Sequence, residues 1–213
     1  MNKIFNINLG GYPFVIDDDA YKKLNKYLDT IQKHFRKSEG CEEIVGDIEA
    51  RIAELFNEHA KGQPIVSMRD VEGVIQIMGT PQEFGASDAI DDEDDTPHTK
   101  TKSKFTTGKR LYRDTDDKVI GGVCSGMAAY FGVSDPLIFR LIFAVLFIGG
   151  VGILAYILFW IIVPRAKTSS EKLSMKGEPI NVNNIAKQVE DELNNLSHTI
   201  TDFAKDISNK NWK

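Results

Sequence analysis

The cysteines and histidines, which most often supply metal ligands and nucleophiles, are scattered along this chain. Its 213 residues include two Cys and four His. Cys41 and Cys124 have no C-x-x-C spacing, which argues against a disulfide framework or a thiolate metal site. No two histidines are spaced to lie on one face beside a carboxylate. We therefore expect reduced structural thiols, no metal and no cofactor.

A glycine-rich stretch, GGVCSG at 121–126, is the nearest approach to a phosphate-binding loop. Such loops cradle phosphates with backbone N–H groups, but this one lacks the P-loop lysine and a preceding buried strand. No Ser/His/Asp set and no pair of carboxylates suited to acid–base work accompanies it. The sequence thus predicts a protein that is not an enzyme and has no small-molecule substrate. The net charge of −5 leaves no basic surplus for a nucleic-acid partner.

The dominant element is the apolar segment 137–163, whose single charge is Arg140. As one helix it would reach about 40 Å, more than the ~30 Å hydrocarbon core of a bilayer, so we expect a membrane-embedded segment. Gly149, Gly150 and Gly152 divide it into two runs. One bent span, which we favour, and a re-entrant hairpin both fit this pattern.

Three polar side chains in this segment have predicted roles at the membrane. Arg140 either has a partner inside the membrane or, as we favour, extends to the interface from the first turn. Tyr156 and Trp160 near the far end are typical of an interfacial aromatic belt.

Residues 1–86 predict a small α+β domain. Alternating apolar residues around Gly10 and Gly11 predict a β-hairpin at 4–16, and apolar stripes at 3–4 spacing predict helices after it. The N-terminus has no long apolar core and no cleavage-like site, so we expect this domain in the cytosol. Residues 87–107, acidic and then rich in Lys and Thr, predict a disordered linker.

Residues 180–209 predict an amphipathic helix of coiled-coil type. Apolar side chains recur at alternating spacings of three and four over nearly four heptads, and the flanks lack the basic face of a lipid-binding helix. We expect self-association or docking to another helical protein, with packing against the N-terminal domain left open. The residues predicted to contact the partner are Val189, Leu193, Leu196, Ile200 and Phe203.

The stretch 109–166 has small, aromatic and charged residues in a specific order just before and within the apolar segment. Gly122 and Gly126, four residues apart, would let another backbone approach a short helix closely. Asp135 and Pro136 would begin the next helix. The other positions of this pattern are Leu111, Arg113, Ile120, Val123, Cys124, Ala128, Tyr130, Phe131, Gly132, Val133, Arg140, Tyr156, Trp160 and Pro164. Together these residues resemble the PspC domain of the phage-shock-protein C family, over residues 109–166. A second resemblance, of the helices in 1–86 to small HAAS-like domains, is carried by Ile48, Glu49, Arg51 and the Gly79-Thr80-Pro81 turn.

Together these patterns predict a mostly α-helical membrane protein. It would have a small N-terminal α+β domain, a PspC-like membrane module and a C-terminal coiled-coil-like helix. The PspC resemblance implies a membrane-anchored regulatory adaptor of the envelope stress response in the bacterial inner membrane. Its partners would be the lipid bilayer and a helical protein, PspA-like, or a second copy. The alternative is an oligomeric membrane scaffold; a small pore ranks last because few polar residues interrupt the apolar segment.

Overall fold

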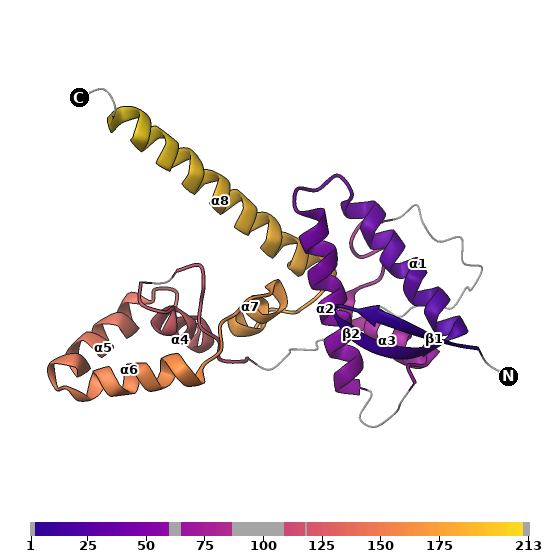
Figure 1. Cartoon of the computed structure of the whole chain (residues 1–213), viewed down its shortest axis with the longest axis horizontal. Coiled ribbons are helices and arrows are strands. Elements are labelled where there is room, and N and C mark those ends of the chain that lie inside the picture. The colour runs from indigo at the N-terminus through magenta and orange to yellow at the C-terminus, as the bar shows by residue number, and fades with distance from the viewer. Residues whose placement is uncertain (1–2, 60–64, 87–108, 118, 211–213) are drawn as a thin grey trace. The chain divides into compact units, whose positions relative to one another are not determined.

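The computed structural model describes residues 3–59, 65–86, 109–117 and 119–210, and the predicted linker 87–107 lies outside them. The chain divides into two compact units, Met1–Ser103 with Asn181–Lys213, and Lys104–Ile180. Within the described ranges the fold is mostly helical with one two-stranded sheet (Figure 1). The elements are β1 (Ile4–Leu9), β2 (Tyr12–Asp17), α1 (Asp18–Phe35), α2 (Cys41–His59), α3 (Met68–Met78), α4 (Val123–Phe131), α5 (Leu137–Ile148), α6 (Val151–Ile162), α7 (Ser169–Lys176) and α8 (Val182–Lys210).

The first unit begins with the predicted β-hairpin. Strands β1 and β2 are antiparallel, with Leu9 opposite Tyr12. Gly10 and Gly11 both have positive φ, 55° and 86°, as a two-residue hairpin turn with right-handed strand twist requires. The free edge of β2 is extended by Val66, whose N–H donates to the Val15 carbonyl at 2.8 Å.

The core of the first unit lies where α1, α2 and α3 pack on one another and on the hairpin. Apolar residues at 3–4 spacing on each helix form this core because that spacing places them on one face. Its fully buried side chains include Ile16, Ile31, Ile44, Ile48, Ile52, Phe56, Val71 and Met78.

Helix α8 belongs to this unit and packs on α2. Gly40, just before α2, has φ 79°, and a Cβ there would lie 2.5 Å from Leu193 Cδ1 and 3.1 Å from Val189 Cγ1. The amide of Asn183 donates to the carbonyl of Glu83 at 3.2 Å. The first half of the predicted coiled-coil seam is therefore already occupied within the chain.

The prediction of a membrane-spanning helix over 137–163, and with it of a transmembrane fold class, is wrong. The segment forms two helices of 12 residues each, α5 and α6. Each is about 18 Å long against a hydrocarbon core of about 30 Å. None of the described helices is long and apolar enough to cross a membrane.

The three glycines of this segment explain the break. Gly150 has φ 75°, a left-handed conformation that ends the helical path. At Gly152 a Cβ would lie 2.6 Å from the carbonyl carbon of Leu146, so only glycine lets α6 turn back this closely along α5. Of the two arrangements that the sequence left open, the helices adopt the hairpin.

Candidate functional site

The second unit is closed at its base by backbone pairing across the hairpin. The N–H of Arg113 donates to the carbonyl of Pro164 at 2.8 Å, and the N–H of Ala166 donates to the carbonyl of Arg113 at 3.0 Å. Arg113 and Arg165 thus form a parallel bridge. The chain before α4 and the chain after α6 are joined here.

The side chain of Arg113 reinforces this closure. Its Nε donates to the Val163 carbonyl at 2.8 Å and its Nη1 to the Gly121 carbonyl at 3.2 Å. The guanidinium is buried. Burial, with the nearby charge of Arg165, lowers the pKa of Arg113 below its ordinary value. The sequence analysis assigned Arg113 only to the family pattern, because both of its acceptors are backbone carbonyls, which leave no residue-type signal in a sequence.

Gly122 and Gly126 form a surface of α4 against which another stretch of backbone lies. A Cβ at Gly126 would be 2.0 Å from the carbonyl oxygen of Tyr112, and one at Gly122 would be 1.8 Å from that of Asp114. Gly122 also has φ 75°. The sequence predicted that another stretch of backbone approaches this glycine pair closely. That stretch is segment 112–114, which also forms the base of the unit.

The hairpin is held together by an aromatic cluster. Phe143 and Phe147 of α5 face Tyr156 of α6, with ring centroids 5.2 Å and 5.9 Å from that of Tyr156 in edge-to-face arrangements. Val123 of α4 is buried in the same cluster. The Tyr156 hydroxyl donates to the Ile120 carbonyl. Tyr156 therefore ties α6 to the segment before α4, a different environment from the interfacial belt predicted for it.

Arg140 has a partner from outside the hairpin. Its Nη2 lies 2.8 Å from Asp117 Oδ1, and about a third of its side chain is exposed. The sequence did not single out Asp117, since a residue separated by 23 positions and a glycine-rich turn gives no spacing signal.

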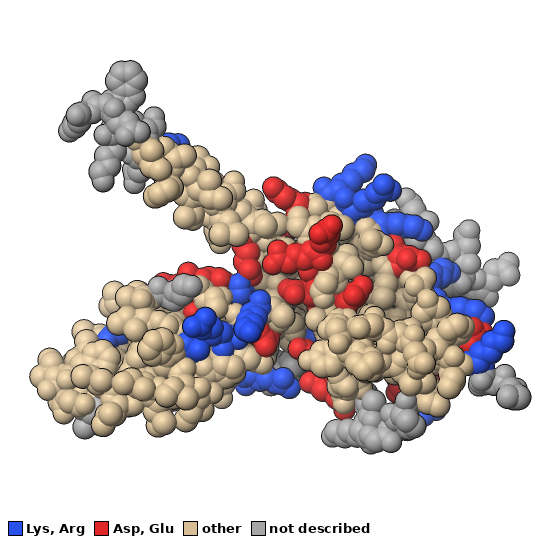
Figure 2. All heavy atoms as spheres, viewed as in Figure 1, with Lys and Arg blue, Asp and Glu red and all other residues tan. Residues whose placement is uncertain are grey.

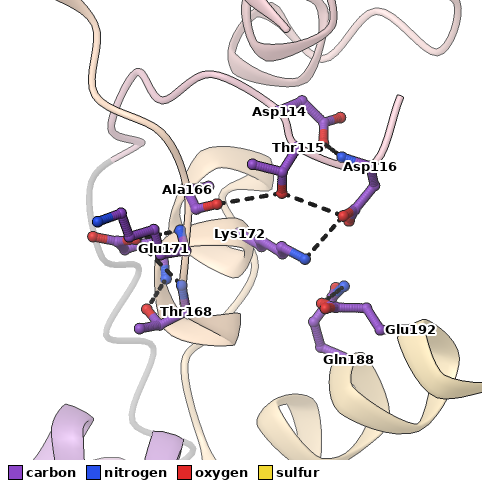
Figure 3. Close-up of polar contacts among 10 residues, drawn as sticks. Asp114, Thr115, Asp116, Ala166, Thr168, Glu171, Lys172, Gln188 and Glu192 are labelled. Atoms are coloured by element: carbon purple, nitrogen blue, oxygen red, sulfur yellow. Dashed lines mark hydrogen bonds and ion pairs between the residues drawn. The ribbon is translucent and has the colours of Figure 1, made fainter. Parts of the chain in front are cut away.

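The loop that carries Asp117 is fixed by its own polar contacts (Figure 3). The N–H of Asp116 donates to Asp114 Oδ1 at 2.9 Å, and the Thr115 hydroxyl lies 3.3 Å from both Asp116 Oδ1 and the Ala166 carbonyl oxygen. Lys172 of α7 donates to Asp116 Oδ1 at 3.0 Å. These contacts hold residues 114–116, which immediately precede Asp117 in the chain.

The remaining predicted residues of the module lie near the helix ends. Asp135 caps α5, because its Oδ1 accepts from the Leu137 N–H at 2.8 Å, and Pro136 stands at the N-cap. The ring of Phe131 stacks on Phe139 at 5.7 Å. The Tyr130 carbonyl accepts from Lys109 Nζ at 3.2 Å.

Trp160 lies beside Gly121, where a Cβ would be 3.0 Å from its indole Nε1. The side chain is still 43% exposed. A side chain at position 121 would displace the indole, so the absence of a side chain at Gly121 leaves room for Trp160 near the base of the hairpin.

The outer surface of the hairpin is apolar and exposed. Figure 2 shows it as a largely uncharged expanse on the face in view. The side chains of Leu154, Ile161 and Ile148 are 73%, 76% and 89% exposed. The other large exposed ones are Leu137, Ile138, Leu141, Ile142, Val145, Leu146, Ile153, Ile157, Leu158, Trp160 and Ile162. A continuous apolar surface of this size is a typical mark of membrane or protein contact.

The five predicted partner-contacting residues of α8 fall into two groups. Val189 is buried and Leu193 half-buried, both near Gly40. Leu196, Ile200 and Phe203 are 59%, 68% and 67% exposed. The seam is thus divided after Leu193 into a packed half and an exposed half.

Comparison with known protein families identifies a PspC domain at residues 109–166. These residues begin just before the base of the second unit and end at it. No curated protein and no solved structure matches the chain significantly. The HAAS-like resemblance of the N-terminal domain stays a prediction.

Proposed function

Because residues 109–166 form a PspC domain, which indicates a phage-shock-type stress-response protein, we propose that this chain is a non-enzymatic adaptor. In this proposal it is attached to the bacterial inner membrane and acts through protein–protein contacts. The observation that carries the proposal is the apolar outer surface of the α5–α6 hairpin.

The hairpin is suited to enter one leaflet. Helices of 12 residues reach about 18 Å, a little over half of a ~30 Å hydrocarbon core. Arg140 stands three residues after the start of α5, and Trp160 two residues before the end of α6. Both therefore lie near the base of the hairpin, at the depth where such side chains meet lipid head groups.

A hairpin that enters and leaves one leaflet keeps both of its flanks on the same side of the membrane. The N-terminal domain and α8 would then share the cytoplasm, which agrees with their packing in one compact unit. Reporter fusions after residue 104 and after residue 213 test this arrangement. Both reporters should be active in the cytoplasm, and reporters on opposite sides would contradict it.

Vesicle flotation tests attachment through the hairpin. The double variant Leu141→Glu/Leu154→Glu places two charges on side chains that are 63% and 73% exposed, and it should no longer float with vesicles. The control Leu196→Glu/Ile200→Glu adds two charges to exposed apolar side chains of α8 and should float like the unaltered chain. Equal flotation of both double variants would contradict hairpin insertion.

The partner-binding surface in this proposal is the exposed half of the α8 seam, centred on Ile200 and Phe203. Apolar residues at 3–4 spacing with mainly uncharged flanks suit a coiled-coil partner of the PspA-like kind. The variant Ile200→Asp/Phe203→Asp should lose a co-purifying helical protein and keep vesicle flotation. A matched control, Asn194→Asp/Thr201→Asp, adds the same charge outside the seam and should keep the partner.

The alternative is an oligomeric scaffold that assembles through the same seam. Crosslinking distinguishes the two, because an adaptor gives mainly hetero-complexes and a scaffold gives homo-oligomers. Homo-oligomers alone, lost in Ile200→Asp/Phe203→Asp, would replace the adaptor with the scaffold.

A further inference from the structure

A pocket of about 140 Å³ lies within the second unit, where the segment before α4 meets the hairpin. Its lining includes Ile120 and Cys124 and, from the hairpin, Phe143, Phe147 and Tyr156. It opens to the surroundings, and Arg140 is one of its lining residues.

Both hydroxyl groups in the lining of this pocket are engaged with backbone carbonyls. The Tyr156 hydroxyl donates to the Ile120 carbonyl, and the Ser125 hydroxyl donates to the Gly122 carbonyl at 3.4 Å. Within the described residues Arg140 forms hydrogen bonds through Nη2 alone, to Asp117. Its Nε and Nη1 thus keep donors for a further anion.

The pocket has a polar end and an apolar end. Arg140 is in the first turn of α5, and Phe147 stands seven residues, about 10 Å, nearer to the tip. An apolar cavity of about 150 Å³ accepts a molecule the size of benzene, so this pocket accommodates roughly six carbon atoms. A ligand that matches it has an anionic head and a short apolar segment behind it.

We propose that this pocket binds one phospholipid, with the phosphate on the Arg140 guanidinium and a six-carbon length of acyl chain among Phe143, Phe147 and Tyr156. A guanidinium offers parallel N–H donors whose geometry matches a phosphate. The inference rests on the proposed membrane attachment, because attachment brings Arg140 to head-group depth. It goes beyond attachment in assigning one lipid to a defined site.

Native mass spectrometry of the full chain in a mild non-ionic detergent tests the site with short lipids. Dihexanoyl phosphatidylglycerol, which carries two six-carbon chains, should bind once per chain. Arg140→Gln should weaken it about tenfold or more, the effect expected from losing a charge-assisted contact. Arg110→Gln, which removes the same charge outside the pocket lining, should leave the affinity within twofold.

A second variant gives a change of opposite sign. Asp117→Asn removes the carboxylate that competes with phosphate for Arg140, so it should strengthen phosphatidylglycerol binding severalfold. Asp117 is more than half exposed, so this isosteric change should be tolerated by the fold even where Arg140→Gln is not. Unchanged or weaker binding in Asp117→Asn would overturn the role of Arg140.

Two further ligands distinguish the source of the anion. Dihexanoylglycerol, which has no phosphate, should bind at least tenfold more weakly, and equal binding would overturn the phosphate contact. Hexanoate that binds as tightly as the phospholipid and depends on Arg140 would make the ligand a free fatty acid and overturn the proposal. These measurements use no bilayer, so failure of flotation with intact lipid binding would count against the proposed attachment alone.

Discussion

Replacing Gly126 with alanine tests the packing on which the second unit depends. Alanine is the better helix former, and an exposed helical Gly→Ala change stabilises by about 0.5–1 kcal/mol. At Gly126 the new Cβ would lie 2.0 Å from the Tyr112 carbonyl oxygen. The closest ordinary C···O contact is about 3.3 Å, so segment 112–114 must move by roughly 1.3 Å.

The magnitude follows from what that movement disturbs. Overpacking a close-packed site costs about 1–3 kcal/mol. The displaced segment also carries the hydrogen bonds of Asp114 to Gly122 and of Arg113 to Pro164, at 3.1 Å and 2.8 Å, each worth about 0.5–1.5 kcal/mol. After the gain in helix propensity, Gly126→Ala should lower the free energy of unfolding by about 1–5 kcal/mol, the upper end applying if both hydrogen bonds are lost.

Gly149→Ala is the matched control in the same unit. Gly149 has φ −78°, and a Cβ there would lie 3.6 Å from the Leu146 carbonyl oxygen, an ordinary contact. This variant should be neutral or more stable by a few tenths of a kcal/mol, because alanine restricts the unfolded chain.

Trp160 provides the assay, since its indole lies beside Gly121 in this unit. Urea titrations in one mild detergent, followed by Trp160 fluorescence in a Trp212→Phe background, compare the two variants with the unaltered chain. The packing argument is refuted if Gly126→Ala unfolds at the same or a higher urea concentration than Gly149→Ala.

Three other predictions concern single side chains. Tyr27→Phe should destabilise the first unit by about 1–2 kcal/mol in urea unfolding, because the buried Tyr27 hydroxyl donates to the Gly79 carbonyl at 2.7 Å. Burial raises the pKa of Glu49 above its ordinary value. The folded state therefore binds this proton more tightly than the unfolded state does, and the contribution of Glu49 to stability falls as the pH rises from the unfolded-state pKa through the folded-state pKa. Glu49→Gln should therefore raise the unfolding temperature at pH 7, with the difference vanishing at low pH; a difference that persists at pH 3 would contradict this cause. Burial also raises the pKa of the Cys124 thiol, so a thiol reagent at pH 8 should modify it far more slowly than Cys41, and equally fast only after unfolding in urea.

Local sequence signals predicted the β-hairpin and the PspC domain well. A Gly-Gly pair between alternating apolar residues leaves few alternatives to a two-residue turn, and the turn forms at Gly10 and Gly11. The PspC resemblance rested on a specific order of small and aromatic residues, and the family comparison confirms it over 109–166.

The transmembrane prediction failed because the length of an apolar segment does not determine whether its backbone continues straight or turns back. Segment 137–163 has the composition of a span, but the left-handed φ of Gly150 and the close approach at Gly152 reverse the chain after 12 residues. The glycines were noted in the sequence, yet their order alone could not distinguish a bend from a reversal.

The heptad pattern in 180–209 likewise correctly indicated an amphipathic helix and could not divide its seam. Val189 and Leu193 lie against Gly40, which is distant in the sequence. Ile200 belongs to the same heptad pattern, but its side chain is exposed to solvent. The contact of Arg140 with Asp117 could not be predicted from the sequence for a similar reason. Like the division of the α8 seam, it depends on which distant segments the fold brings together.

The base at Arg113 and Ala166 has a consequence for how this domain can be moved between proteins. The two ends of the domain are hydrogen-bonded to each other at Arg113 and Ala166. The residues between them therefore form a closed loop that can be inserted at one position of a host chain. Segments with adjacent ends are the ones that tolerate insertion into other chains. The family match over 109–166 encloses this loop. We expect 109–166, joined through short linkers into an exposed loop of an unrelated protein, to keep its Trp160 environment without its native neighbours.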